Sequence, residues 1–224
     1  RRREREKERE KERVKEEAEK VQIETIKEEV KEEVKMPEPL LPDLFIDIED
    51  SIYKKEINVL ASKGIIKGVG NGAFQPNSKL TRAEFVQMLV SGLNLKSEIH
   101  RRFNDINEAD WYYNAVSIAS GLGLVQGVGN DRFEPNKEIS REEIMVILKR
   151  TADILELTFD SQNAPVFHLL AENDISPWAS DSLLYMKQID VLKDELAFTN
   201  AKEAPNRDET VHYIYNLLIN SKTI

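Results

Sequence analysis

The chain has 224 residues, of which 40% are apolar, and this is enough for one compact core with an additional segment. No apolar run approaches the roughly 20 residues of a membrane-spanning helix, so the sequence predicts no membrane span. The absence of cysteine excludes disulfides and thiolate chemistry. Because the chain begins at Arg1 without an initiator methionine or a signal peptide, we expect it to be a piece of a longer protein.

The net charge of −9 is unevenly distributed. Residues 1–35 hold 13 Lys or Arg and 13 Glu, whereas the remainder holds 19 basic and 28 acidic side chains. An acidic surface repels nucleic acid and anionic lipid through its long-range field, so nucleic acid is not an expected partner. Any anionic ligand must therefore be captured by local geometry.

Residues 1–36 are predicted to form a charged helix or spacer, because they are almost all Glu, Lys and Arg and contain no Gly or Pro before Met36. Their short apolar runs are out of register, which favours a solvated single helix over a coiled coil, although helix-mediated self-association stays open. Three prolines within residues 37–44 end the helix and predict a linker.

From residue 45 onward the chain repeats itself. Residues 64–76 recur at 123–135 with an offset of 59 and no gap, and residues 80–84 recur at 139–143. A third, divergent copy lacks the glycines and the Phe-x-Pro of the other two. This self-similarity predicts a repeat architecture. The predicted units are residues 45–96, 103–157 and 173–220.

Each unit is predicted to be a helix, a tight loop and a second helix, with apolar residues every three or four positions. The first helices would carry Ile52, Ile57 and Leu60, then Trp111, Ala115, Val116 and Ala119, then Trp178, Ser182, Leu183 and Met186. The second helices would carry Phe85, Leu89 and Leu93, then Ile144, Leu148 and Ala152, then Val211, Ile214 and Leu218. One apolar stripe cannot bury itself alone, so we expect an all-α domain at 45–224 with three repeats around a pseudo-threefold axis.

Each second helix begins with a predicted capping box, in which one side-chain oxygen accepts from the third helical amide and a Glu accepts from the cap amide. The pairs are Thr81 with Glu84, Ser140 with Glu143, and Asn206 with Glu209. Capping is a sufficient explanation for these residues and is favoured over direct ligand contact.

Arginine occupies the first helical position in all three units, at Arg82, Arg141 and Arg207. A cation there opposes the helix dipole by roughly 0.3–1 kcal/mol, so its recurrence needs a reason. Free backbone amides beside a guanidinium form a good anion site, especially for a carboxylate. The alternative is an internal salt bridge to one of three aspartates, Asp47, Asp105 or Asp174; ligand binding is favoured.

The loops around Gly68 and Gly127 lack the preceding strand and the following Lys-Ser/Thr of a nucleotide site. Their Asn-Gly and Asn-Asp pairs predict tight turns with positive φ, and the absence of these pairs from the third unit predicts a loop of another shape.

Trp111 and Trp178 are predicted to start equivalent helices with one face buried, and stacking on a sugar ring is the alternative. His100, His168 and His212 share no spacing that suits a metal site, and we expect His212 to be a packing residue. No Ser-His-Asp arrangement stands out. The sequence therefore predicts no metal, no cofactor and no enzymatic activity.

The Phe-x-Asp-Ile opening, the Gly-x-x-x-Gly loop with Phe-x-Pro, and Thr-Arg-Ala-Glu together resemble the S-layer homology family over residues 45–220. The resemblance implies an all-helical pseudo-trimer whose inter-repeat grooves bind secondary cell-wall polymer through a pyruvylated N-acetylmannosamine. It implies an extracellular location in the bacterial cell wall or S-layer. It also implies that Arg82, Arg141 and Arg207 pair with the pyruvate carboxylate. The remaining groove residues would be Asp47, Asp105, Asp174, Gly68, Gly127, Trp111 and Trp178.

Departures from the family pattern limit the number of competent grooves to one or two. Ile52 replaces the tryptophan of the first unit, and Asp190 and Asp194 replace both glycines of the third.

Two hypotheses follow from the sequence. The first is a module that anchors its parent protein non-covalently to an acidic wall polysaccharide, or to another polymer associated with peptidoglycan. The second is a structural module in which the helix at 1–36 mediates protein–protein association.

Overall fold

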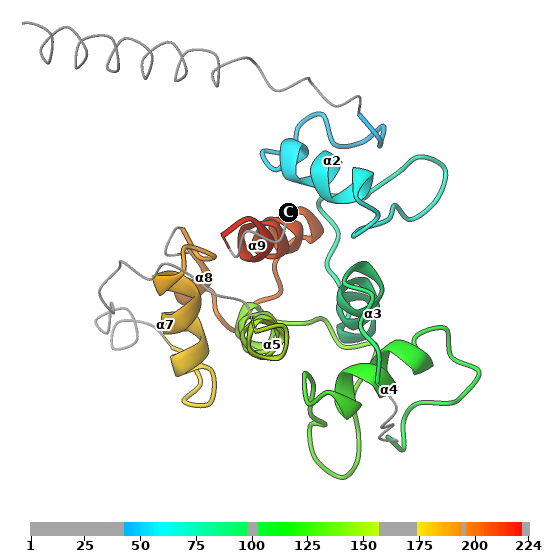
Figure 1. Cartoon of the computed structure of the whole chain (residues 1–224), viewed down its shortest axis with the longest axis vertical. Helices are drawn as coiled ribbons and strands as arrows, with labels where there is room; N and C mark the ends of the chain where they lie inside the picture. The colour runs from blue at the N-terminus through cyan, green and yellow to red at the C-terminus, as the bar shows by residue number, and fades with distance from the viewer. Residues whose placement is uncertain (1–42, 98–102, 157–173, 194–195, 221–224) are drawn as a thin grey trace, which may run out of the picture. The chain divides into compact units, whose positions relative to one another are not determined.

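The computed structural model describes residues 43–97, 103–156, 174–193 and 196–220 (Figure 1). The predicted helix at 1–36, most of the predicted linker at 37–44, His100, His168 and Asp194 lie outside these ranges. The division of the chain into spacer, linker and repeat domain therefore stays a prediction.

The described residues form helices and no named strand, which confirms the all-α class. The first helices of the three repeats are α2 (Lys54–Ser62), α4 (Tyr113–Gly121) and α7 (Ser180–Gln188). The second helices are α3 (Arg82–Gly92), α5 (Arg141–Ile154) and α9 (Arg207–Asn220), and the third repeat adds the short helix α8 (Leu196–Thr199). Among these described helices, none is long and apolar enough to cross a membrane.

Each second helix packs against the first helix of the following repeat. α3 packs on α4, α5 packs on α7, and α9 packs on α2. In Figure 1, α3, α5 and α9 lie nearest the centre, with α2, α4 and α7 around them. Because α9 returns to α2, the last repeat closes onto the first, and the three repeats form one cycle. The pseudo-threefold symmetry of this cycle stays a prediction.

Backbone hydrogen bonds follow the same cycle at the start of each second helix. The Arg82 amide donates to the Lys137 carbonyl (2.9 Å), and the Arg141 amide donates to the Glu203 carbonyl (3.0 Å). The Arg207 amide closes the cycle by donating to the Ser78 carbonyl (2.8 Å). The first amides of a helix have no partner within it, so a neighbouring repeat satisfies them here.

The core is built from the predicted stripes of the second helices. Phe85 of α3, Ile144 of α5 and Val211 of α9 are fully buried. Burying an apolar side chain of this size stabilises the fold by about 1.5–3 kcal/mol. Each repeat therefore contributes to the stability of the domain through the core residues of its second helix.

The predicted stripes of the first helices are wrong at one position in each repeat. Ile52, Trp111 and Trp178 are 85%, 62% and 58% exposed. The helices begin at Lys54, Tyr113 and Ser180, so these three residues lie in the preceding turns, outside the face that the helical period directs to the core.

The tight turns of the first two repeats are confirmed. Asn71 and Gly72 have φ of 52° and 73°, and Asn130 and Asp131 have φ of 51° and 53°. Two consecutive residues in this region are the signature of a type I′ turn. The third repeat carries α8 in the corresponding segment, which confirms that its loop has another shape.

Candidate functional site

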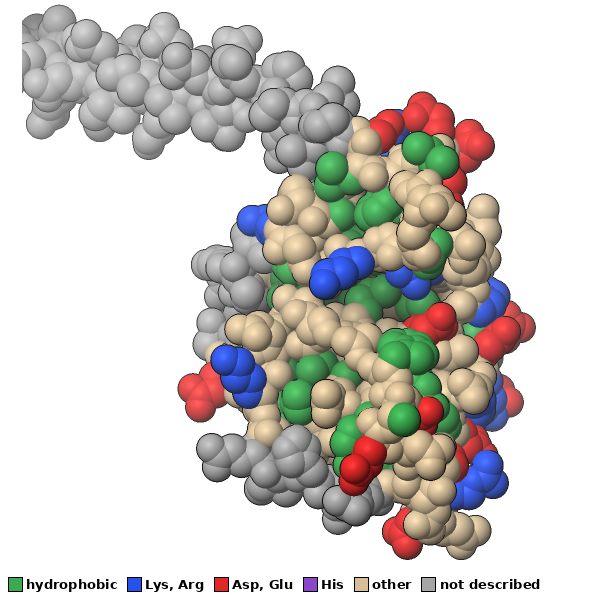
Figure 2. All heavy atoms as spheres, turned by 90° about the vertical axis from the view of Figure 1, so that its right-hand side faces the viewer, with side chains coloured by type: hydrophobic (Ala, Val, Ile, Leu, Met, Phe, Trp, Pro, Cys, Tyr) green, Lys and Arg blue, Asp and Glu red, His purple; other side chains and the backbone are tan. Residues whose placement is uncertain are grey.

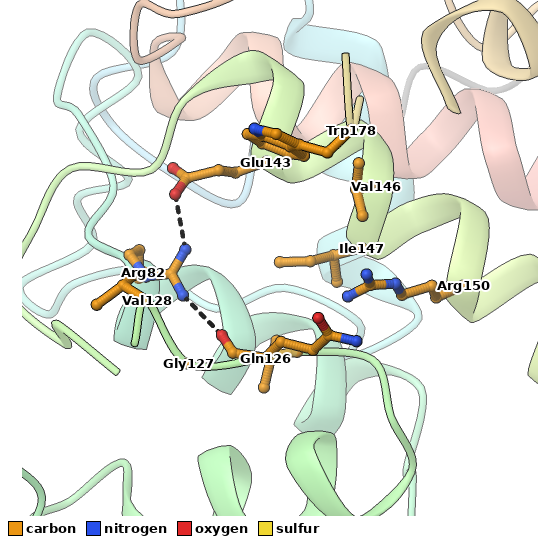
Figure 3. Close-up of a pocket in the computed structure, with 10 residues that line it drawn as sticks. Arg82, Gln126, Gly127, Val128, Glu143, Val146, Ile147, Arg150 and Trp178 are labelled. Carbon is orange, nitrogen blue, oxygen red and sulfur yellow. Dashed lines mark hydrogen bonds and ion pairs between the residues drawn. The ribbon is translucent and has the colours of Figure 1, made fainter. Parts of the chain in front are cut away.

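Two open pockets lie between repeats and are built from equivalent elements. The first, about 370 Å³, is lined by Arg207, the loop 64–69, one side of α3 and Trp111. The second, about 300 Å³, is lined by Arg82, the loop 125–128, one side of α5 and Trp178 (Figure 3). We call them the Arg207 groove and the Arg82 groove. Each takes its arginine from one repeat, its loop and helix from the next, and its tryptophan from the one after.

Figure 2 shows hydrophobic and basic side chains next to each other on the face that carries α2, α3 and α4. Such a surface can hold the apolar face of a sugar ring and a negative group together.

Arg82 is 5% exposed and bridges the first two repeats. Its Nη1 donates to Glu143 Oε1 (2.9 Å), and its Nη2 lies 3.4 Å from the Gln126 carbonyl (Figure 3). Its Nε donates to the Phe133 carbonyl (2.9 Å). The guanidinium also lies over the Phe133 ring, 4.7 Å from its centroid. Glu143 therefore partly neutralises the cation of this groove.

Arg141 forms a bidentate ion pair across the boundary between the second and third repeats. Nε donates to Glu209 Oε1 (2.6 Å) and Nη2 donates to Glu209 Oε2 (2.7 Å). Nη1 lies 3.3 Å from the carbonyls of Asn200 and Glu203. Burial alone would lower the pKa of Arg141, but the bonds to Glu209 outweigh it and raise the pKa above its ordinary value.

Arg207 is 8% exposed and has a different environment. Its Nη2 donates to the Lys67 carbonyl (3.0 Å), and its guanidinium lies 4.9 Å from the centroid of the Phe74 ring. Its Nε is buried without a hydrogen-bond partner, and no described carboxylate forms an ion pair with it. Burial, only partly offset by the charge of Glu84, lowers its pKa.

The two sequence-based explanations of the arginines both need correction. The amides beside them are not free, because neighbouring repeats accept their hydrogen bonds. The aspartates are not their partners either: Arg82 and Arg141 pair with the capping glutamates of the next repeat. In these two pairs the cycle of repeats brings the arginine of one repeat beside the glutamate of the next.

Asp47 and Asp105 hold the loops of their own repeats. Asp47 accepts from the amides of Phe74 and Gln75 at 2.8 Å, and Asp105 accepts from those of Phe133 and Glu134 at 2.8 Å. Partial burial would raise the pKa of both carboxyls, but these backbone bonds lower it. Asp174 is exposed and pairs with Lys202 (2.6 Å). None of the three lines either groove.

Gly68 and Gly127 line the two grooves, and both positions lack room for a side chain. A Cβ at Gly68 would lie 2.6 Å from Phe45 Cε1, and one at Gly127 would lie 3.0 Å from Phe103 Cε1. These glycines let the loop backbone approach the opening residues of the repeat.

The capping boxes are formed at Thr81 with Glu84 and at Ser140 with Glu143. The third differs, because the Glu209 amide that a capping Asn206 would bind donates to Asp208 Oδ1 (2.8 Å). The Asn206 side-chain oxygen accepts from Lys79 Nζ (2.8 Å). The short side chain of Asp208 takes this amide, whereas Glu142 at the equivalent position of α5 binds Ser176 and leaves the capping box intact.

Several groove residues were missed by sequence analysis. Arg150 lines the Arg82 groove and donates to the Leu124 carbonyl (3.1 Å), and Ser91 takes its place in the Arg207 groove. The 59-residue offset between the first two repeats aligns Ser91 with Arg150, and this alignment was the sequence signal that could have identified both positions. In the described part of the chain, no group of three or more His, Asp or Glu is arranged to hold a metal ion.

Residues 45–86 and 102–145 match the model of the S-layer homology domain. The chain carries S-layer homology repeats. The matched residues fall in the first two repeats, so the assignment of the third to the family stays a prediction, supported by the equivalent place of α7 and α9 in the cycle.

The relatives are longer proteins from bacteria. Over 182 residues, 80% of this chain, the sequence is 32% identical to Exoglucanase XynX of Acetivibrio thermocellus and covers 17% of it. It is 33% identical to the amylopullulanase of Thermoanaerobacterium thermosulfurigenes over the same length and covers 10% of it. Over 155 residues it is 30% identical to the Surface-layer 125 kDa protein of Lysinibacillus sphaericus, covering 13%.

The chain therefore spans less than a fifth of these relatives. Because enzymes and surface-layer proteins share these S-layer homology repeats, the repeats correspond to a binding and anchoring module and not to one catalytic activity. The family gives the chain an extracellular, cell-wall-associated location.

Proposed function

We propose that this chain anchors its parent protein to the bacterial cell wall by holding an acidic secondary cell-wall polymer, a pyruvylated glycan, in the grooves between repeats. The supporting observation is that each groove combines a buried arginine at its base with a widely exposed tryptophan at its rim. A guanidinium suits a carboxylate, and an exposed indole suits the apolar face of a sugar ring. The binding involves no bond chemistry and no cofactor.

A repeating polymer strengthens such an anchor. Each groove would hold one sugar weakly, but a second groove on the same polymer binds at a high effective concentration. The parent protein would remain attached while individual sugars exchange.

Co-sedimentation of the 224-residue chain with purified cell-wall sacculi tests this proposal. Three preparations are compared: intact walls, walls from which the pyruvyl groups have been removed, and walls stripped of secondary polymer. We expect recovery to fall strongly in the second and third. Equal recovery from all three would contradict the proposal and indicate peptidoglycan as the ligand.

Variants at the exposed rim supply the matched control. Trp111→Ala and Trp178→Ala remove exposed indoles and should leave the unfolding midpoint unchanged while reducing recovery. Ile52→Ala changes the corresponding residue of the first repeat, which is 85% exposed and lines neither groove, and recovery should not change. An equal loss in all three variants would contradict a groove-specific site.

A further inference from the structure

The three repeat boundaries share one design but differ in whether their arginine is neutralised. Glu143 pairs with Arg82 and Glu209 pairs with Arg141, and Glu84 is the residue in the equivalent position for Arg207. Glu84 lines the Arg207 groove, yet it forms no ion pair with Arg207 within the described residues. Its Oε2 accepts from the Thr81 amide (2.7 Å).

Resting on the proposed function, we propose that the boundaries are unequal anion sites and that the Arg207 groove is the primary one, prepared for a sugar carrying a single carboxylate. The Arg82 groove is attenuated by Glu143, and the boundary at Arg141 is closed.

The buried, unpartnered Nε of Arg207 is the first argument. Removing a guanidinium donor from water without giving it an acceptor is unfavourable. Arg207 is only 8% exposed, and its Nε has no hydrogen-bond partner. A carboxylate entering the groove would supply the missing acceptor and the missing negative charge. The same ligand at Arg82 would have to compete with Glu143, which lies 2.9 Å from Nη1.

The complete pairing of Arg141 with Glu209 is the second argument. Both oxygens of Glu209 are bound by the guanidinium, and the Tyr213 hydroxyl donates to Glu209 as well. Tyr213 stands at the position of Met88 and Ile147, which line the two grooves, and it is buried, with 4% exposure. A ligand carboxylate there would have to displace a buried ion pair, which is costly.

The remaining lining of the Arg207 groove suits a sugar that carries a negative group. Lys67 is exposed at the groove and adds a second cation, where the Arg82 groove has Gln126. Gln87 and Ser91 present groups that can donate to or accept from sugar hydroxyls. Trp111, at the rim, is positioned for stacking.

Arginine side-chain NMR on the full chain tests the inequality directly. The Nε–Hε resonances are followed while sodium pyruvate is added, and they are assigned with Arg-to-Lys variants. We expect the Arg207 resonance to shift progressively and saturate, a smaller shift at Arg82, and no shift at Arg141. A shift at Arg141 equal to that at Arg207, or no shift at Arg207, would overturn the inference.

Calorimetry with a pyruvylated N-acetylmannosamine glycoside gives the affinities. Arg207→Gln should weaken the tighter site at least tenfold, and Glu143→Gln should strengthen the weaker one. Lys149→Gln, which changes a surface pair with Asp153 outside both grooves, is the control and should have no effect. If Arg207→Gln leaves the tighter site intact, the inference fails.

The two proposals fail separately. Saturable pyruvate shifts at Arg207 without recovery on pyruvylated walls would contradict only the polymer as the ligand. Polymer-dependent recovery that is insensitive to Arg207→Gln would contradict only the ranking of the boundaries.

Discussion

Arg141 and Glu209 are joined by two hydrogen bonds of 2.6 and 2.7 Å across the boundary between the second and third repeats. Arg207, at the equivalent position of the next boundary, has no such partner among the described residues. The same residue type at the same helical position is therefore paired with a carboxylate at one boundary and unpaired at the other.

Removing Arg141 should destabilise the fold. Arg141→Ala leaves Glu209 buried and unpaired, and breaking a buried ion pair in this way costs about 3–5 kcal/mol. Urea denaturation followed by circular dichroism measures this loss. Lys149→Ala, which breaks an exposed pair with Asp153 and a contact 5.2 Å from the Tyr185 ring centroid, should cost about 1–1.5 kcal/mol and serves as the control. Similar losses in the two variants would show that the Arg141 pair is not a stabilising contact.

Removing Arg207 should have little effect on stability but abolish binding in its groove. Arg207→Met replaces an unpaired buried cation with an apolar side chain of similar length, so the free energy of unfolding should change by about 1 kcal/mol or less. The same denaturation series provides the measurement, alongside wall recovery. A loss as large as that of Arg141→Ala would mean that Arg207 is a structural residue.

Stability should fall in acid partly through Glu209. Burial would raise the pKa of Glu209, but hydrogen bonds from Arg141 and Tyr213 outweigh it and hold the pKa below its ordinary value of 4.5. A lowered carboxyl pKa stabilises the folded state fully above pH 4.5, and this contribution is lost as the pH falls further. Denaturation midpoints between pH 6 and pH 2 measure it. Glu209→Gln should give a shallower decline below pH 4.5, and an unchanged slope would exclude this residue as a source.

Asp105 should matter for the loop that shapes the Arg82 groove. Asp105→Asn places an NH₂ group against one of the two amides that the carboxylate accepts from, and one unsatisfied amide costs about 1–3 kcal/mol. We expect lower stability together with weaker ligand binding at that groove, measured by denaturation and calorimetry. Asp174→Asn is the matched control from the third repeat, where the carboxylate is exposed and the expected change is within about 0.5 kcal/mol. Equal effects would argue against a loop-holding role.

The sequence by itself determined the features that depend on near neighbours along the chain. The repeat is visible directly as an offset of 59 residues in the sequence. The two capping boxes and the positive φ of Asn71 and Asn130 follow from residues within one turn or one loop, and the helical class follows from the apolar period within each helix. Local hydrogen bonding and backbone sterics dictate such features, so they can be derived without knowing how the repeats meet.

Only the tertiary structure decided what the three arginines contact. Arg82 and Arg141 reach carboxylates 61 and 68 residues away, and no local pattern distinguishes them from Arg207. The exposure of Ile52, Trp111 and Trp178 was likewise decided by where each helix starts and which neighbour covers it. Helical periodicity fixes the direction of a side chain within its own helix, whereas the partner it meets depends on how α9 closes the cycle onto α2.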